Sequence, residues 1–237
     1  MKYVFMYQGL GDFIDCNGMI RYFQHLYGEI GLFVKTRNVK LISYMYRDNP
    51  NIHIIEIPGI NEVEEVHNYL NTQNTNFSEI INIGHGLDVS HMMHSSGKNC
   101  WEIFYELAKV PYNIRYKMFY LERDLNEEDR IVNKLTNGEE YIFVHDDPSR
   151  GFVIDNEMLS KVTDISKIRI IKNDITENPF HFISLFQKAK EIHCMESSLK
   201  SIIDSYDMGN KPLYFHRSLR KAPIGDKTLN KWITIER

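Results

Sequence analysis

Residues 191–209 read EIHCMESSLKSIIDSYDMG and contain a strand, a turn and a helix in direct succession. The first four residues are predicted to form a short buried strand, and residues 195–198 a tight polar turn. Gly209 is predicted to end the helix. A strand, a turn and a helix in this order are the repeating unit of an α/β fold. The apolar residues after the turn recur at the spacing of one helical face; they are Leu199, Ile202, Ile203 and Tyr206.

The turn itself, MESS, can be interpreted in two ways. Free backbone N–H groups and small hydroxyl side chains at a helix start favour an anion such as a phosphate. Ser197 or Ser198 could instead simply cap the helix, which serine does well without any ligand. The turn alone does not decide between these interpretations, so the rest of the chain has to be considered.

The composition is that of an ordinary globular protein. The chain has 237 residues, of which 43% are hydrophobic and 25% charged, which allows one large domain or two small ones. Its formal net charge of −4 argues against a general nucleic-acid-binding protein, which usually carries a basic excess. No run approaches the ~18 apolar residues of a membrane span, and the first residues lack a signal-peptide core. Three distant cysteines, Cys16, Cys100 and Cys194, are typical of reduced thiols, so we predict a cytoplasmic protein with no transmembrane segment.

The first half alternates between strand and helix signals. Residues 2–8 (KYVFMYQ) are predicted to form a buried strand, and Gly9-Leu10-Gly11-Asp12 a tight glycine turn before a helix. Further strands are predicted at residues 31–35, 51–57 and 79–83, with helices between them. This order favours a parallel sheet with right-handed crossovers, although the third glycine of a dinucleotide-binding fingerprint is absent.

Residues 85–99 show no clear period and are predicted to form a mobile loop at the strand ends. They contain His85, His91 and His94, which invites a metal interpretation, but the spacing is loose and only Asp88 is a nearby carboxylate, so no metal site is predicted. A helix is expected at residues 100–109, and an extended connector at residues 112–123.

The second half repeats the same pattern. Strands are predicted at residues 140–145, 167–172, 191–194 and 212–216, and helix starts at Asn126, Asn156 and Asn178. The basic last twenty residues could cross back to the first domain or cover a sheet edge. We therefore predict an α/β fold of two Rossmann-like domains, residues 1–120 and 121–237, with parallel sheets facing across a cleft.

Asp12 is the candidate catalytic residue of the first domain. It follows the first strand, where a carboxylate could take a proton from a hydroxyl nucleophile, and Gly9 and Gly11 are expected to expose the turn. The alternative is a helix cap, which aspartate also does well. Asp15 is a weaker second candidate.

Candidate binding residues of the second domain follow its strands. Arg150 could grip a diphosphate in bidentate fashion, or pair with Asp146 or Asp147 at the surface. Those two acids suggest a divalent metal only weakly. Backbone and side chains of the MESS turn could hold phosphates, and Glu196 the ribose hydroxyls. The full candidate set is His145, Ser149, Arg150, Glu196, Ser197, Ser198 and His216.

Two short motifs resemble those of the GT-B glycosyltransferases, in particular the heptosyltransferase-like family. Gly11-Asp12 after the first strand is similar to the family's N-terminal Gly-Asp, and the resemblance implies that Asp12 is the catalytic base. Glu196-Ser197-Ser198 looks like the family's acidic-hydroxyl turn, which implies that it holds the donor diphosphate. The chain departs from the family at this turn, which is usually Asp-Ser/Thr-Gly followed by His, and it lacks the proline expected after Gly-Asp.

The resemblance implies a transferase that moves a sugar from a nucleotide-diphosphate donor to a glycan, lipid or other hydroxyl acceptor, with no cofactor and no metal. Two alternatives stay open at this point. One is a non-catalytic nucleotide- or sugar-binding module. The other is an α/β nucleotide-dependent hydrolase that uses Asp146 and Asp147 with a metal.

Overall fold

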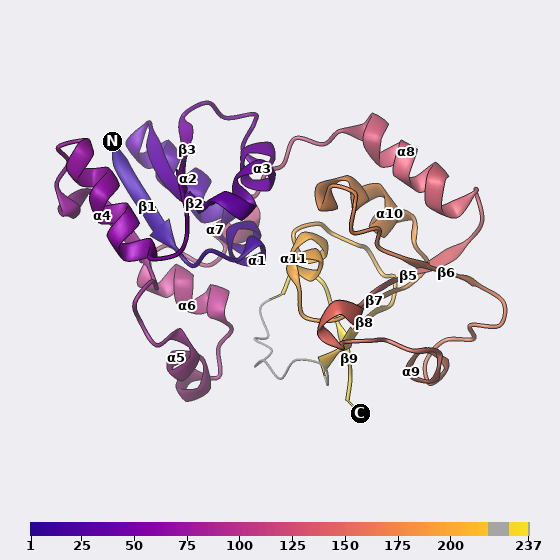
Figure 1. Ribbon diagram of the computed structural model, residues 1–237. Coiled ribbons are helices and arrows are strands. Elements are labelled where there is room, and N and C mark those ends of the chain that lie inside the picture. The colour runs from indigo at the N-terminus through magenta and orange to yellow at the C-terminus, as the bar shows by residue number, and fades with distance from the viewer. Residues whose placement is uncertain (218–227, 237) are drawn as a thin grey trace. The chain divides into compact units, whose positions relative to one another are not determined.

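The computed structural model of the protein describes residues 1–217 and 228–236. These residues form two compact units: unit 1 comprises Met1–Glu122, and unit 2 begins at Arg123 (Figure 1). Each unit is built on one sheet in which all neighbouring strands are parallel. The predicted α/β class with two parallel sheets is confirmed.

Unit 1 has a four-stranded sheet with the order β3-β2-β1-β4. The chain runs from β1 outward to β3 and returns to the other side of β1 for β4, so the winding reverses between β1 and β4. In open α/β sheets, ligands bind outside the carboxyl ends of the strands at such a reversal. The strands are β1 (Lys2–Met6), β2 (Ile30–Lys35), β3 (Ile52–Ile57) and β4 (Ile80–Ile83).

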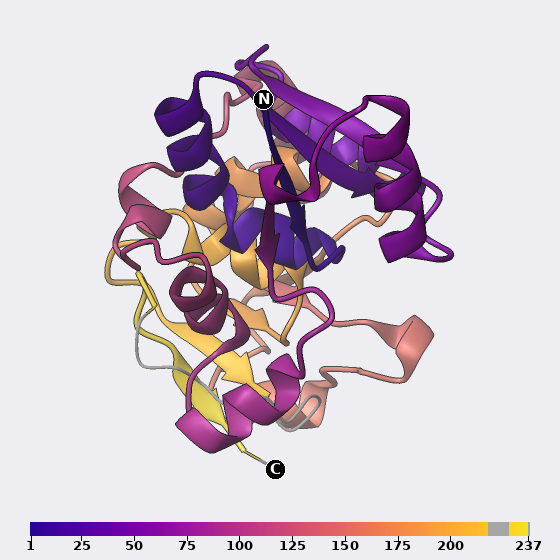
Figure 2. The same ribbon diagram turned by 90° about the vertical axis from the view of Figure 1, so that its left-hand side faces the viewer.

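Helices cover both faces of this sheet. The helices α2 and α3 connect strands on the outward path, whereas α4 lies on the return path, and right-handed crossovers therefore place α4 on the opposite face (Figure 1; Figure 2). The helical segments of unit 1 are α1 (Leu10–Asp15), α2 (Asn17–Tyr27), α3 (Thr36–Met45), α4 (Glu62–Thr72), η1 (Phe77–Glu79), α5 (Val89–Ser96), α6 (Cys100–Leu107) and α7 (Ile114–Lys117).

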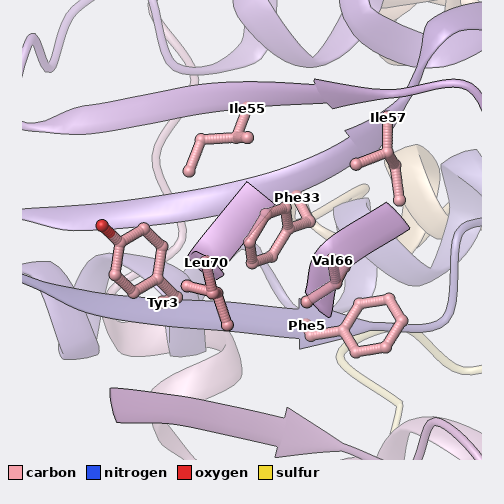
Figure 3. Close-up of a cluster of buried hydrophobic side chains, with 7 residues drawn as sticks. All are labelled: Tyr3, Phe5, Phe33, Ile55, Ile57, Val66 and Leu70. Carbon is pink, nitrogen blue, oxygen red and sulfur yellow. The ribbon is translucent and has the colours of Figure 1, made fainter. Parts of the chain in front are cut away.

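The core under α4 explains why this helix packs where it does. Successive strand residues point to opposite faces, so Tyr3 and Phe5 of β1 share one face with Phe33 of β2 (Figure 3). Val66 and Leu70 of α4, one helical turn apart, pack onto them. Each such buried side chain contributes roughly 1.5–3 kcal/mol to folding. Ile55 and Ile57 of β3 complete the cluster.

Unit 2 has a five-stranded sheet with the order β6-β5-β7-β8-β9. The chain passes from β5 to β6 and then returns across β5 to β7, so the winding reverses between β5 and β7. The last strand, β9, pairs with β8 at the edge of the sheet, which is one of the two predicted places for the C-terminal segment. The elements are α8 (Leu125–Thr136), β5 (Tyr141–His145), η2 (Pro148–Arg150), α9 (Asn156–Ser160), β6 (Arg169–Lys172), η3 (Pro179–Phe182), α10 (Ile183–Lys188), β7 (Ile192–Cys194), α11 (Ser198–Asp204), β8 (Leu213–His216) and β9 (Ile233–Ile235).

The alternation along β5 assigns the helices of unit 2 to its two faces. Ile142 and Val144 form a buried cluster with Leu159 of α9. Phe143, which points to the other face, meets Phe186 of α10 with ring centroids 4.9 Å apart. Residues of β5 are therefore buried on both sides, which is the reason for its unbroken apolar sequence.

One predicted loop is in fact a helix. Residues 85–99 were expected to be mobile, but Val89–Ser96 forms α5. The Asp88 side chain caps its start by accepting the His91 N–H at 2.9 Å. Only Val89 of this helix is buried, so no apolar stripe marks it in the sequence. The predicted extended connector likewise contains the short helix α7.

Three predicted helix ends are displaced. Asp124 and Asp155 cap α8 and α9, in place of the predicted Asn126 and Asn156, because their side chains accept backbone N–H groups three residues on. At its other end α11 stops at Asp204, well before Gly209. The predicted cap Asn178 is confirmed, since it accepts the Phe180 N–H at 3.1 Å.

Candidate functional site

The winding of unit 2 brings the two polar turns of the second half together. His145 at the end of β5 lies opposite Cys194 at the end of β7, and the Met195 N–H donates to the His145 carbonyl at 3.3 Å. The turn after β5 and the MESS turn after β7 therefore leave the sheet side by side, at the point where the winding reverses. Five predicted binding residues lie in these turns: Ser149, Arg150, Glu196, Ser197 and Ser198.

The turn after β5 is closed by Asp147. The Asp147 and Phe152 backbones pair in a short antiparallel bridge. The Asp147 carboxylate accepts the Ser149 hydroxyl and the Arg150 guanidinium, each at 2.5 Å, and these bonds lower the pKa of Asp147 against the opposing effect of burial. The Arg150 side chain is 52% exposed. Because an exposed ion pair is weak, Arg150 can exchange Asp147 for another anion at low cost.

Two further polar residues border this turn. His145 is buried, and its Nδ1 lies 2.8 Å from the Asn173 Oδ1. Burial lowers the pKa of His145, although the bond to Asn173 opposes this, so the imidazole is neutral at pH 7. The Asp146 carboxylate points elsewhere: it accepts the Ile154 N–H at 3.1 Å and the Lys172 ammonium at 2.5 Å. Asp146 and Asp147 thus bind different partners and do not converge on one point.

The MESS turn combines a structural cap with exposed polar groups. The Ser197 hydroxyl caps α11 by accepting the Lys200 N–H at 3.2 Å, so the capping interpretation holds for Ser197. Ser198 is the first residue of α11, and both Ser198 and Glu196 are partly exposed. The turn therefore presents Glu196 and Ser198 to solvent on a backbone that Ser197 fixes.

A buried ion pair lies behind the MESS turn. Lys200 donates to Asp204 at 2.8 Å, and its ammonium lies 5.0 Å from the ring centre of Trp232. Burial alone would lower the pKa of Lys200, but the charges of Asp204 and Glu196 raise it above its ordinary value. The Trp232 indole N–H donates to Asp204 at 2.7 Å. The C-terminal segment is thereby anchored to α11.

His216 lies at the end of β8 but inside the unit. It has no exposed surface, and its Nε2 lies 3.0 Å from Nδ1 of His193, which is also fully buried. The His193 ring stacks on Tyr214, and its Nε2 lies 3.3 Å from the Thr163 hydroxyl. Burial lowers the pKa of His193 to about 3 and that of His216 to about 4. The contact between His216 and His193 links β8 to β7, so the position of His216 fits a structural role better than contact with a ligand.

Asp12 of unit 1 lies in the first turn of α1, where its carboxylate accepts the Gly9 N–H at 3.1 Å. Three residues connect β1 to α1, and neither glycine uses a left-handed backbone, because Gly9 has a φ of −77° and Gly11 lies within α1. Gly9 matters for another reason: a Cβ at this position would lie 2.7 Å from the Asp12 Oδ2. Asp15, the weaker candidate, is buried in an ion pair with Arg115 at 2.7 Å.

A charged cluster of unit 1 is absent from the predicted site residues. Glu62, at the start of α4, accepts Nε2 of His85 at 2.8 Å and also pairs with the Lys35 ammonium. His85 thus pairs with a carboxylate, whereas His94 contacts the Ser90 carbonyl. Among the described residues, no group of three or more histidine, cysteine, aspartate or glutamate side chains could hold a metal ion.

Comparisons with known proteins identify the fold. No protein-family model matches the sequence, and no curated protein matches it. A solved structure of a family 9 glycosyl transferase from Veillonella parvula DSM 2008 matches with a TM-score of 0.56 and 11% identity, over 100% of this chain and 86% of that chain. The chain has a glycosyltransferase fold. The predicted resemblance to the GT-B enzymes is thereby confirmed at the level of the fold.

Two further solved structures share this fold. E. coli ADP-heptose lps heptosyltransferase II matches with a TM-score of 0.51 and 12% identity, over 99% of this chain and 90% of that chain. The iron-containing dodecameric glycosyltransferase TibC from enterotoxigenic E. coli H10407 matches with a TM-score of 0.54 and 11% identity, over 90% of this chain and 57% of that chain. Separately, no helix within residues 1–217 and 228–236 is long and apolar enough to cross a membrane.

Proposed function

We propose that the protein is a glycosyltransferase that moves a sugar from a nucleotide-diphosphate donor to a hydroxyl group of a glycan, lipid or other acceptor. The observation that carries the proposal is the meeting of two polar turns at the winding reversal between β5 and β7. This is the place where open α/β sheets bind their ligands. The glycosyltransferase folds of the similar solved structures give independent support.

The donor is assigned to unit 2. Arg150 releases Asp147 and binds the diphosphate with its planar guanidinium, which matches phosphate oxygens in bidentate fashion. Ser198 and Ser149 supply hydroxyl groups at the same edge, and His145 borders it. Ser197 acts mainly through its cap, which fixes the backbone of the turn. Glu196 accepts the ribose hydroxyls.

The acceptor is assigned to unit 1, with Asp12 as the general base. The acceptor oxygen forms a bond to the anomeric carbon as the bond to the leaving diphosphate oxygen breaks, and Asp12 takes the hydroxyl proton. The negative charge that develops on the nucleoside diphosphate is balanced by Arg150. Transfer is proposed to need no divalent metal and no cofactor, in keeping with the bonds of Asp146 to Lys172 and Ile154. We also propose a cytoplasmic location, in line with the free thiols.

Calorimetry with nucleoside diphosphates and nucleotide sugars tests the donor assignment. The double variant Arg150→Ala/Ser198→Ala is expected to weaken binding roughly 10²–10⁴-fold, since hydrogen bonds to charged groups contribute about 1.5–3 kcal/mol each and every 1.4 kcal/mol is about tenfold. The control pair Lys167→Ala/Ser43→Ala, at exposed positions outside the site, should leave binding unchanged. Equal affinity in both pairs would remove these residues from the site.

Turnover of the bound donor tests the chemistry. Asp12→Asn is expected to lower transfer about 10²–10⁴-fold while donor affinity stays the same. Unchanged transfer would contradict the base assignment. Donor binding without transfer to any acceptor in the wild-type protein would favour the binding-module alternative. Loss of activity on adding a chelator would favour the metal-dependent hydrolase.

A further inference from the structure

A cavity of about 420 Å³ opens at the carboxyl edge of the sheet of unit 1. It lies where the winding reverses, because Tyr7, Gln8 and Gly9 follow β1 while His85 and Gly86 follow β4. Its volume is that of a site for a small molecule. We call it the Glu62 pocket; it is lined by Tyr7, Gln8, Gly9, Lys35, Arg37, Glu62, His85 and Gly86.

The walls of the Glu62 pocket are held in place by bonds within unit 1. Buried Gln8 donates to the Phe33 carbonyl at 3.1 Å and accepts the Lys35 N–H at 3.1 Å, which ties the ends of β1 and β2 together. The His85 ring stacks on Phe5 with centroids 4.0 Å apart. A rigid, preformed lining of this kind lowers the entropic cost of binding a ligand.

Opposite charges lie side by side in the Glu62 pocket. The side chains of Lys35, Glu62 and His85 are 16–20% exposed, and Lys35 and His85 each pair with Glu62. Burial would raise the pKa of Glu62, but the hydrogen bonds from Lys35 and His85 lower it, so the carboxylate stays ionised near neutral pH. The charge of Lys35 is therefore compensated within the pocket.

Arg37 carries a further positive charge at the Glu62 pocket. It is exposed, and the described residues place no carboxylate within ion-pair distance of it; nearby Glu56 binds the Thr36 hydroxyl instead. Arg37 stands in the first turn of α3, a ten-residue helix whose start has no side-chain cap. A guanidinium at such a helix start favours an oxyanion with two oxygen atoms to share.

We propose that the Glu62 pocket binds a small hydroxylated molecule with one oxyanion group, a carboxylate or a phosphate ester, which Arg37 holds. The Glu62 carboxylate and the His85 imidazole face the hydroxyl groups. The proposal does not depend on glycosyl transfer, because binding is measured without any nucleotide sugar. It also concerns residues outside the turns of unit 2.

Titration of the full chain with glucuronate, glucose 6-phosphate and glucose, followed by NMR at low ionic strength, tests the proposal. Glucuronate or glucose 6-phosphate should shift the amide signals of Gly9 and Gly86, and whichever binds more tightly identifies the oxyanion. Arg37→Gln should weaken that binding at least tenfold, and Arg37→Lys less, since lysine keeps the charge but loses the planar fork. Lys40→Gln, which removes an exposed charge from the same helix, should leave binding intact.

A second variant tests the electrostatic argument directly. Glu62→Gln removes the negative charge that compensates Lys35, so anion binding should become several-fold tighter. Binding of neither anion, binding of glucose as tight as that of the anions, or an Arg37→Gln variant that binds like the wild type would each overturn the proposal.

Discussion

Gly9 and Asp12 show how one missing side chain shapes the candidate catalytic residue. The Asp12 carboxylate lies against the Cα of Gly9 and accepts its N–H. A methyl group at Gly9 would come 2.7 Å from the Asp12 Oδ2, which is closer than real side chains approach. The carboxylate is the far end of a side chain, so it would turn aside at little cost to the fold.

We therefore expect Gly9→Ala to lower kcat by at least tenfold while thermal stability and donor affinity hardly change. The expected loss comes from displacement of the Asp12 carboxylate, the proposed base, and not from a lost contact. A tenfold lower kcat corresponds to an activation free energy that is about 1.4 kcal/mol higher. Steady-state kinetics together with a melting curve provide the measurement. Full activity in Gly9→Ala would argue against a role for Asp12 in proton transfer.

Gly18 illustrates the same principle between two helices, where the neighbour cannot move. A Cβ at Gly18 of α2 would lie 2.4 Å from the carbonyl oxygen of Ile114 and 2.7 Å from that of Arg115, both in α7. Gly18→Ala should lower the free energy of unfolding by about 1–3 kcal/mol, the usual cost of overpacking. Urea denaturation measures this, with Ser43→Ala at an exposed position of α3 as a control that should stay within ~0.5 kcal/mol.

The paired strands β7 and β8 carry a pH dependence at the scale of elements. The pKa is about 3 for buried His193 and about 4 for His216 in the folded protein, against 6.5 when unfolded. Between pH 6.5 and about 4 the unfolded chain binds protons that the folded chain does not. Stability is thus complete above pH 6.5 and falls on acidification, by roughly 1.4 kcal/mol per pH unit for each histidine.

Urea unfolding at pH 7 and pH 5 measures this loss. Because other buried histidines such as His145 add to it, the informative comparison is with His216→Gln. This variant keeps a polar side chain in the interior but does not titrate, so its stability should fall less between the two pH values. The same pH dependence in both proteins would show that the pair is not responsible.

The elements also show what could be predicted from the sequence. Strands such as residues 2–8 and 140–145 were recognisable because burial on both faces leaves an unbroken apolar run. The helix α5 was not, since it buries Val89 alone. The Glu62 pocket could not be predicted either. Lys35, Glu62 and His85 are far apart in sequence and meet only through the strand order β3-β2-β1-β4.

For the site in unit 2, the sequence predicted which turns carry the candidate residues, but not which partners their side chains bind. MESS and the turn after β5 were both recognisable as polar segments that follow strands. Arg150 pairs with Asp147, and the Ser197 hydroxyl accepts the Lys200 N–H. Both contacts depend on side-chain geometry, which the spacing of residues in the sequence does not encode. The buried position of His216 depends in the same way on the pairing of β8 with β7.

At the scale of the whole molecule, the two proposed ligands should leave separate signatures. Hydrogen exchange is expected to slow in β5, β7 and α11 when a nucleoside diphosphate binds, because binding stabilises the unit that holds the ligand. Glucuronate or glucose 6-phosphate should instead slow exchange in β1, β4 and α3. Mass spectrometry of the full chain measures both effects in one experiment. Protection of unit 1 by the nucleotide would contradict the donor assignment.

The contacts of Asn230 and Trp232 also determine which parts of the two units can fold first during translation. Asn230 donates to the carbonyl oxygens of Ile203 in α11 and of Tyr206 just after it, at 3.0 and 2.9 Å. Trp232 donates to Asp204, and its ring contacts the Lys200 ammonium. The four strands of unit 1 are complete once Ile83 has been translated. By contrast, α11, which follows the MESS turn, can contact Asn230 and Trp232 only after residues 228–236 have been translated. Without β9 the edge of β8 lacks its neighbour, so a chain truncated after residue 217 and released from the ribosome would present an unpaired edge that is open to aggregation.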